Sequence, residues 1–170
     1  MILLTTFGAW LIADLLSGLA HWYEDIHLIG PQRTRWIDRI RIDNEAHHKR
    51  PSEMVKCGLW QTINTSILIA WPLALAMMLI GAPALFWLAA IFAGFGNLTH
   101  RWAHTPRSRL SPAIRFCQHI GLFISREQHA HHHYNDGGLV MKENSTGNYC
   151  TMTSWLNPAI DWIRNKLTGG

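Results

Sequence analysis

The sequence predicts an all-α integral membrane protein with about three transmembrane helices and a histidine-rich helical cap on the cytoplasmic side. Apolar segments of membrane-spanning length occupy residues 2–20, 58–80 and 83–99. All fifteen Lys and Arg and all eleven histidines lie outside these segments. Only 15% of the residues are charged, against about 25% in ordinary soluble domains. We therefore interpret residues 1–170 as a single membrane domain.

The first predicted span is apolar except for two threonines, Asp14 and Ser17. No Lys or Arg precedes it, whereas a secretory signal peptide begins with positive charge. The second span begins with the semi-polar "GLWQTINTS" and becomes strongly apolar. "GAP" at 81–83 predicts a tight turn, and the third span follows directly. The alternative is a soluble helical bundle with an apolar core.

The distribution of positive charge predicts the topology. Lys and Arg are confined to residues 33–56 and 101–166, and none lies at the 81–83 turn. With three spans both basic segments fall on one side, which the positive-inside rule makes cytoplasmic. The N-terminus and the turn are then outside. The basic residues thus indicate a membrane partner and no nucleic acid, and the three unpaired-looking cysteines indicate reduced thiols.

Histidines from four separate segments fall on this same predicted face. In "HAHHH", His129, His132 and His133 share one side of a helix, while His131 points nearly the opposite way. Each segment alone could be a polar loop or a membrane-interface pair, but together they predict a shared metal site. The predicted ligands are His21, His47, His48, His100, His104, His129, His132 and His133.

The ligand types narrow the choice of metal. Eight imidazoles exceed the four ligands of a closed zinc site, and no Cys lies at ligand spacing. The sequence has no pair of Glu-x-x-His motifs, which argues against the carboxylate-bridged helical bundle of soluble di-iron proteins. Two metal ions sharing about eight neutral imidazoles suit a di-iron centre that activates O₂ against an inert C–H bond. Beyond metal binding we assign no catalytic residue.

Three further polar residues are candidates to support the ligands. Asp14 lies two helical turns before His21 and is costly inside a span, so we expect it to accept a hydrogen bond from a ligand imidazole. Asp25 and Asn97 are similar candidates. Asn157–Pro158 predicts the end of one helical turn and the start of another, without a chemical role.

Five motifs then carry a resemblance over nearly the whole chain: "DLLSGLAHW" (14–22), "HHKRP" (47–51), "NLTHRWAH" (97–104), "HAHHH" (129–133) and "YCTMTSWLNP" (149–158). Their order resembles the lipid desaturase family of the Kua-type plasmanylethanolamine and plastid phosphatidylglycerol desaturases. The resemblance implies a membrane di-iron enzyme that uses O₂ and an external donor, such as cytochrome b5 or ferredoxin, to desaturate a glycerophospholipid chain. It carries over the same eight histidine ligands.

The chain departs from the family pattern just before Tyr149. A further histidine usual just before Tyr-Cys is absent from residues 142–148, so His27, His119 or His131 replaces it or the ligand is missing. A site at the interfacial helix ends predicts a double bond near the headgroup. The alternatives are a membrane di-metal hydroxylase and a non-enzymatic transition-metal or haem-binding membrane protein.

Overall fold

The computed structural model describes residues 1–27, 34–134 and 147–168. All regular elements in these ranges are helices, so the all-α prediction is confirmed. In chain order they are α1 (Ile2–His27), α2 (Arg35–Lys49), α3 (Glu53–Lys56), α4 (Leu59–Leu79), α5 (Ala84–Ala93), α6 (Gly96–His104), the 3₁₀ turn η1 (Arg107–Arg109), α7 (Pro112–His119), α8 (Arg126–His133) and α9 (Asn157–Thr168).

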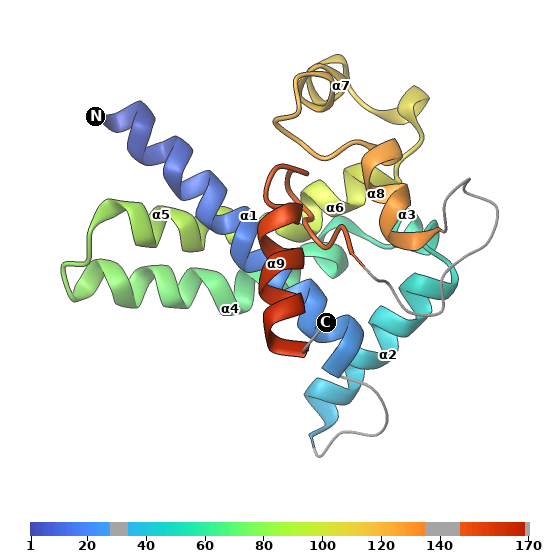
Figure 1. The fold of residues 1–170 in the computed structure, drawn as a ribbon, viewed down its shortest axis with the longest axis horizontal. Helices are drawn as coiled ribbons and strands as arrows, with labels where there is room; N and C mark the ends of the chain where they lie inside the picture. The colour runs from blue at the N-terminus through green and yellow to red at the C-terminus, as the bar shows by residue number, and fades with distance from the viewer. Residues whose placement is uncertain (28–33, 135–146, 169–170) are drawn as a thin grey trace.

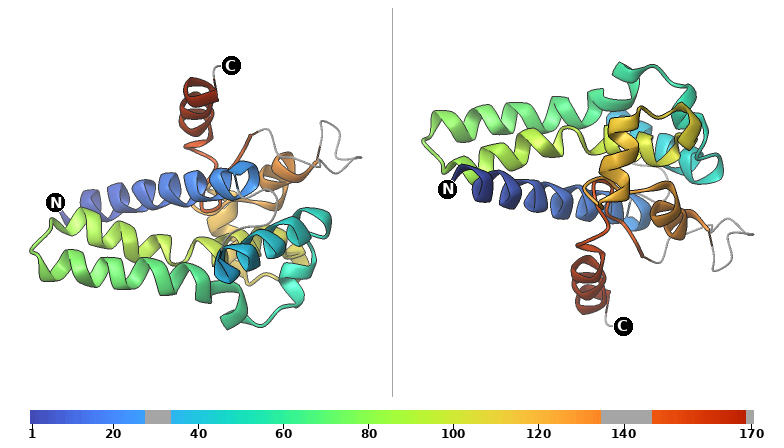
Figure 2. Two further views of the ribbon diagram at one scale, coloured as in Figure 1. Left: turned by 90° about the horizontal axis from the view of Figure 1, so that it is seen from below. Right: turned by 90° about the horizontal axis from the view of Figure 1, so that it is seen from above.

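Three helices form an elongated arm, and α5 packs against both α1 and α4. The N-terminus and the α4–α5 turn lie at the same end of this arm (Figure 1). The shorter helices α2, α3, α6, α7 and α8 gather at the opposite end, and two further views show the same division (Figure 2). We call these two parts the apolar arm (α1, α4 and α5) and the cap (α2, α3, α6, α7 and α8).

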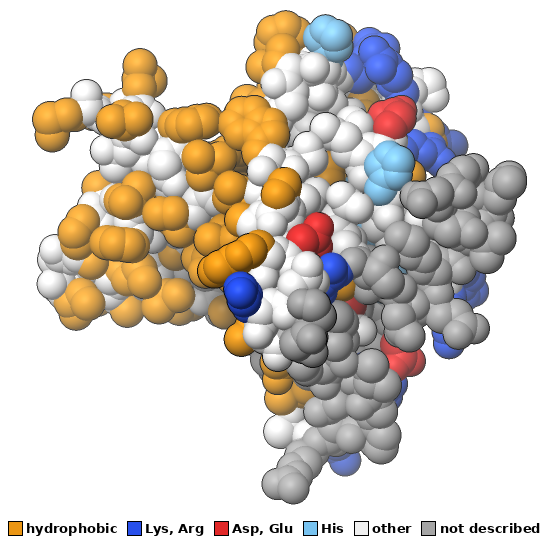
Figure 3. Space-filling view, in the orientation of Figure 1, with side chains coloured by type: hydrophobic (Ala, Val, Ile, Leu, Met, Phe, Trp, Pro, Cys, Tyr) orange, Lys and Arg blue, Asp and Glu red, His pale blue; other side chains and the backbone are white. Residues whose placement is uncertain are grey.

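The apolar arm exposes its hydrophobic side chains. Two helices within the described ranges are long and apolar enough to cross a membrane, over Ile2–Asp25 and Leu59–Leu79, with mean hydropathies of 1.7 and 1.6. Only 22% and 17% of their most apolar windows are buried. Hydrophobic side chains cover the arm, while charged ones lie around the cap (Figure 3). A core helix of a soluble bundle would bury this surface, so the soluble-bundle alternative is disfavoured.

The predicted turn at 81–83 ends α4 through its backbone. Gly81 has a positive φ of 71°, a conformation that glycine adopts without steric cost. The Ala82 N–H donates to the Met77 carbonyl at 2.9 Å, and the Gly81 N–H donates to the Met78 carbonyl at 3.1 Å. This pair of bonds is a Schellman motif. It turns the chain back so that α5 packs alongside α4.

The third predicted span is interrupted. Residues 83–99 form α5 and the start of α6, with a break at Gly94 and Phe95, where one continuous helix was expected. A Cβ on Gly94 would lie 2.6 Å from Nε1 of Trp71, so only glycine admits this indole. The same nitrogen donates to the Ile91 carbonyl at 3.3 Å. Contact with Trp71 therefore accounts for the break, which apolar composition alone did not predict.

Candidate metal centre

The eight predicted histidine ligands converge in the cap, where the ends of four helices meet. α1 contributes one of them, α2 and α6 two each, and α8 three. Most are almost fully buried, and His132 is 0% exposed. Their potential ligand atoms fall into two groups, within each of which all atoms lie within 4.8 Å of one another. Besides the histidines, one carboxylate belongs to these groups.

The first group contains only imidazoles, from α2, α6 and α8. The Nε2 atoms of His100 and His104 lie 3.1 Å apart, and those of His129 and His133 lie 3.0 Å apart. Imidazole nitrogens bound to one metal ion at about 2.1 Å lie roughly 3 Å apart when their bonds form a right angle. The spacing therefore suits a shared ion. We call this the five-histidine group: His47, His100, His104, His129 and His133.

The second group is centred on a carboxylate. Oδ1 of Asp25 lies 2.9 Å from Nε2 of His48 and 3.7 Å from Nε2 of His21, and its Oδ2 lies 3.2 Å from Nε2 of His132. The sequence predicted Asp25 only as a supporting residue. Because its oxygens lie among the imidazole nitrogens, it is itself a candidate ligand. We call this the Asp25 group: His21, Asp25, His48 and His132.

The two groups adjoin because α2 and α8 contribute to both. Successive helical residues point about 100° apart, so His47 and His48 reach different groups from one turn of α2. On α8, His132 belongs to the Asp25 group and His133 to the five-histidine group. The rings of His48 and His133, one from each group, have centroids 4.9 Å apart. Each of the two adjoining groups could hold a metal ion.

The chemical state of the imidazoles fits metal binding. Burial lowers the pKa of His47, His100 and His129 well below the usual value and that of His104 to about 3, so these rings are neutral and keep a lone pair. Both ring nitrogens of His47 are buried without a hydrogen-bond partner among the described residues. Buried polar atoms are seldom left unpaired. A bound cation would satisfy them.

Two ligand rings are oriented by backbone carbonyls of the segment before α9. Nδ1 of His21 donates to the carbonyl of Tyr149 at 3.1 Å, and Nδ1 of His132 donates to the carbonyl of Gly147 at 3.0 Å. A carbonyl only accepts, so the proton is on Nδ1 and the lone pair is on Nε2, which faces Asp25. The "YC" motif thus contributes through its backbone.

Asp14 holds this segment in place. Its Oδ1 accepts hydrogen bonds from the backbone N–H groups of Met152 at 3.1 Å and Thr153 at 2.9 Å, and its Oδ2 accepts from the Thr153 hydroxyl at 2.6 Å. The sequence predicted an imidazole as its partner, and that detail is wrong. Asp14 anchors the loop that carries the orienting carbonyl of Tyr149, and so it acts on the ligands through the backbone.

The chain matches the lipid desaturase domain over residues 10–165. It belongs to the lipid desaturase family. The chain is similar to two Arabidopsis thaliana proteins, "Fatty acid desaturase 4-like 2, chloroplastic" (30% identical, over 93% of this chain and 54% of the relative) and "Fatty acid desaturase 4, chloroplastic" (30% identical, over 93% and 47%). It thus spans about half the length of these relatives. No solved structure matches it significantly.

The remaining predicted residues of this lipid desaturase domain differ in their outcome. His131 is exposed on α8, as helical geometry predicts, and His119 is exposed at the end of α7. Asn97 is half-buried on α6 and makes no hydrogen bond to a ligand among the described residues. The side chain of His27 and most of the stretch 142–148 lie outside the described residues. Asp25, four residues after His21, supplies a carboxylate that was predicted as a supporting group and not as a metal ligand.

Two residues of the domain were missed. The Asn44 amide donates to Oδ1 of Asp25 at 2.8 Å, and its position four residues before His48 places both on one helical face. Arg101 lies between two ligands on α6 and donates to the carbonyls of Met54, Val55 and Cys57 at 2.6–2.9 Å and to the Thr62 hydroxyl at 2.8 Å. It fixes α6 to the chain around α3. No motif around Arg101 indicated this role.

The N-terminal capping of α8 could have been predicted from the sequence. The Ser125 hydroxyl accepts from the Gln128 N–H at 3.2 Å, and Oε1 of Gln128 accepts from the Ser125 N–H at 2.9 Å. "SREQ" is thus a capping box, which satisfies backbone donors at the start of the helix. Gln128 also donates to the Ser154 hydroxyl at 2.9 Å. These bonds fix the start of the helix that carries three ligands.

Proposed function

We propose that the chain is a membrane-bound di-iron desaturase that introduces a double bond near the headgroup end of a glycerophospholipid alkyl or acyl chain. The observation that carries the proposal is the pair of adjoining ligand groups, with eight imidazoles and one carboxylate, at one end of an exposed apolar arm. Membership of the lipid desaturase family and the names of the relatives support desaturation of a lipid chain.

Two iron ions held by these groups would supply the O₂ activation needed to remove hydrogen from two adjacent carbons. In the balanced reaction the lipid loses two hydrogen atoms, and O₂ is reduced to two water molecules with two further electrons and two protons. We propose that an external protein donor, such as cytochrome b5 or ferredoxin, provides these electrons. The overall product is a carbon–carbon double bond with no oxygen retained in the lipid.

The chain's own residues hold and shield the site in this proposal. The carbonyls of Gly147 and Tyr149 keep two imidazoles in the tautomer that presents Nε2. Asp25 brings one negative charge to its group, whereas the five-histidine group is neutral, so the two ions would differ in environment. Burial of the rings excludes bulk water, which protects reactive oxygen chemistry from side reactions.

We propose that the histidine end faces the cytoplasm, because all fifteen Lys and Arg lie in residues 33–56 and 101–166. We also propose that α5 and the first turn of α6 make a third crossing in spite of the break between them. Their close packing against α1 and α4 supports this. The ligands then lie at headgroup depth, which favours reaction at carbons close to the glycerol.

A haem protein fits the donor set less well. A haem iron takes one or two protein ligands, and its porphyrin separates them. Here the donor atoms within each group lie within 4.8 Å of one another, which leaves no room for a macrocycle between them. A di-metal hydroxylase would use the same ligands, and the fate of oxygen separates it from a desaturase.

Lipid analysis after expression in a host that lacks such double bonds tests the proposal. We expect new double bonds within the first few carbons of a phospholipid chain, dependent on O₂ and abolished by Asp25→Asn. His131→Ala, an exposed histidine on α8, is the matched control and retains activity. A hydroxylated lipid with retained oxygen would identify a hydroxylase, and double bonds only at mid-chain would contradict the headgroup-depth argument.

A further inference from the structure

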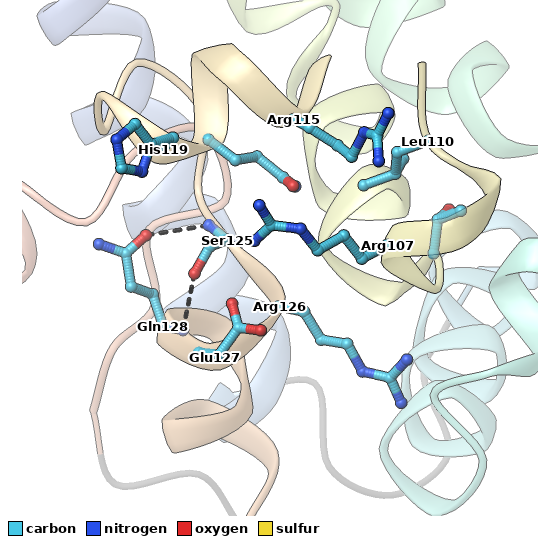
Figure 4. Close-up of a pocket in the computed structure, with 10 residues that line it drawn as sticks. Arg107, Leu110, Arg115, His119, Ser125, Arg126, Glu127 and Gln128 are labelled. Atoms are coloured by element: carbon cyan, nitrogen blue, oxygen red, sulfur yellow. Dashed lines mark hydrogen bonds between the residues drawn. The ribbon is translucent and has the colours of Figure 1, made fainter. Parts of the chain in front are cut away.

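A pocket outside the metal centre has a strongly basic lining. It lies between η1, α7 and the start of α8 and has a volume of about 280 Å³. Arg107 reaches into it from η1, and Arg115 and Arg126 border it from the two helices (Figure 4). The lining also includes one carboxylate, Glu127, and the capping residue Gln128. Three guanidinium groups against one carboxylate leave the pocket with excess positive charge.

The three arginines of this pocket share one nearby carboxylate, Glu127, whose charge interacts with those of Arg107 and Arg126. Within the described part of the chain, no carboxylate lies within 4.0 Å of the guanidinium nitrogens of Arg107, Arg115 or Arg126. Arg41, in contrast, lies 2.7 Å from Glu45 and 3.6 Å from Asp38. Like charges gathered around a cavity repel one another, and an anion in the cavity would relieve this repulsion. A phosphate group suits guanidinium donors because both offer bidentate geometry.

The pocket adjoins the metal centre along the chain. Arg126, Glu127 and Gln128 form the first turn of α8, directly before the ligand His129. Thr105, which also lines the pocket, directly follows the ligand His104. Arg126 precedes the ligand His129 by three residues, and each helical residue adds only about 1.5 Å along the axis. An anion bound at Arg126 would therefore lie close to the ligands. A group bound here would thus be held close to the site of reaction.

The helix α7, which borders the pocket, has an apolar outer face. Phe116 is 61% exposed and Ile120, one helical turn later, is 51% exposed. Arg115, Gln118 and His119 lie on the side of α7 that lines the pocket. Amphipathic helices with apolar residues on one side and basic residues on the other can lie in the plane of the headgroup layer of a membrane. The basic pocket is then at the depth of lipid phosphates.

We propose that this pocket binds the phosphate group of a phospholipid headgroup and so positions the lipid chain beside the histidine ligands. The role of this binding in positioning a substrate rests on the proposed function. The binding itself needs neither metal nor turnover. Glu127 supplies an acceptor for a hydroxyl or ammonium group elsewhere in the headgroup.

Binding to the metal-free full chain in detergent tests the proposal. The probe is dihexanoylphosphatidylglycerol, with dihexanoylglycerol as the uncharged comparison and inorganic phosphate as the free anion, each measured by calorimetric titration. Arg115→Gln should weaken binding of the phospholipid roughly ten-fold, the worth of one charge-assisted hydrogen bond. Arg109→Gln is the matched control, because Arg109 is exposed on η1 beside the pocket but does not line it.

The outcomes separate the possible occupants. Tighter binding of the phospholipid than of dihexanoylglycerol, lost in Arg115→Gln and kept in Arg109→Gln, supports the proposal. Equal loss in both variants would mean diffuse electrostatics and would overturn it. Inorganic phosphate bound as tightly as the phospholipid would overturn the lipid source. No binding of either, with Arg115-dependent binding of an acidic ferredoxin, would identify a docking surface for the electron donor instead.

Kinetics with iron-loaded protein distinguish this proposal from the proposed function. Arg115→Gln should raise the KM for phospholipid with little change in kcat, because it removes binding made equally before and during reaction. If the unaltered chain forms no double bond yet binds the phospholipid through Arg115, the function fails and the pocket stands. If desaturation occurs with an unchanged KM in Arg115→Gln, the pocket assignment fails alone.

Discussion

Replacing Asp14 tests how the loop before α9 controls the metal centre. Asp14 is 0% exposed and accepts two backbone hydrogen bonds, from Met152 at 3.1 Å and Thr153 at 2.9 Å, together with one from the Thr153 hydroxyl. Asp14→Leu keeps the branching at Cγ, with a larger side chain, but leaves both backbone N–H groups buried without an acceptor. At about 1–3 kcal/mol for each unsatisfied group, the free energy of unfolding should fall by about 2–6 kcal/mol.

The same substitution should reduce metal binding. The loop carries the Tyr149 carbonyl that orients His21, so its displacement frees that ring to rotate. Asp14→Asn retains one oxygen for the two backbone donors and should cost less, about 1–2 kcal/mol. Ser17→Ala is the matched control, because the Ser17 hydroxyl accepts one hydrogen bond from the Thr151 hydroxyl of the same loop at 3.1 Å and donates to the Asp14 carbonyl within its own helix.

Thermal unfolding in detergent and iron content per chain measure the two effects. The expected order of stability is unaltered chain, Ser17→Ala, Asp14→Asn, then Asp14→Leu, with iron lost mainly in the last. If Asp14→Leu unfolds at the same temperature as Ser17→Ala and retains its iron, the loop does not position the ligands and the reasoning is refuted.

Three further predictions follow from the packing and the charge pattern. Gly18→Ala places a Cβ 3.3 Å from the Cα of Cys150 and should lower the melting temperature by several degrees. Gly58→Ala is the control, because its Cβ would have nothing within 4 Å, and it should leave the melting temperature unchanged. Equal melting temperatures of the two variants would contradict the close approach of Gly18 to Cys150. Arg101→Met should cost about 2–4 kcal/mol in thermal unfolding, with partial recovery in Arg101→Lys, since four hydrogen bonds are lost. In a background without native cysteines, a cysteine at residue 82 should react with an impermeant reagent from outside intact cells and one at residue 108 should not; the reverse pattern would contradict the proposed topology.

The sequence predicted the parts of this domain that depend on local pattern. Apolar length predicted α1 and α4, and the positive φ required at Gly81 agrees with the predicted turn. Helical spacing separated the exposed His131 from the buried His132, because residues one position apart point in different directions. Confinement of charge to two segments brought all eight predicted ligands to one end, where the structure has them.

What sequence analysis missed depends on contacts between distant segments. The break at Gly94 follows from the indole of Trp71, which lies on another helix. Asp25 joins the ligands only because α2 and α8 bring imidazoles to both of its oxygens. Asp14 accepts hydrogen bonds from loop N–H groups and not from an imidazole, because a segment more than 130 residues later in the chain folds back against it. Residue type and spacing along one helix carry no information on these partners.

Iron content per chain tests the central claim, two metal ions held by two adjoining ligand groups, most directly. Purified protein loaded with ferrous iron should contain about two iron atoms per chain by elemental analysis. His132→Ala removes a ligand of the Asp25 group alone and should retain no more than about one, while His131→Ala, exposed on the same helix, should retain both. Equal iron in the two variants, or a single iron atom in the unaltered chain, would contradict the account.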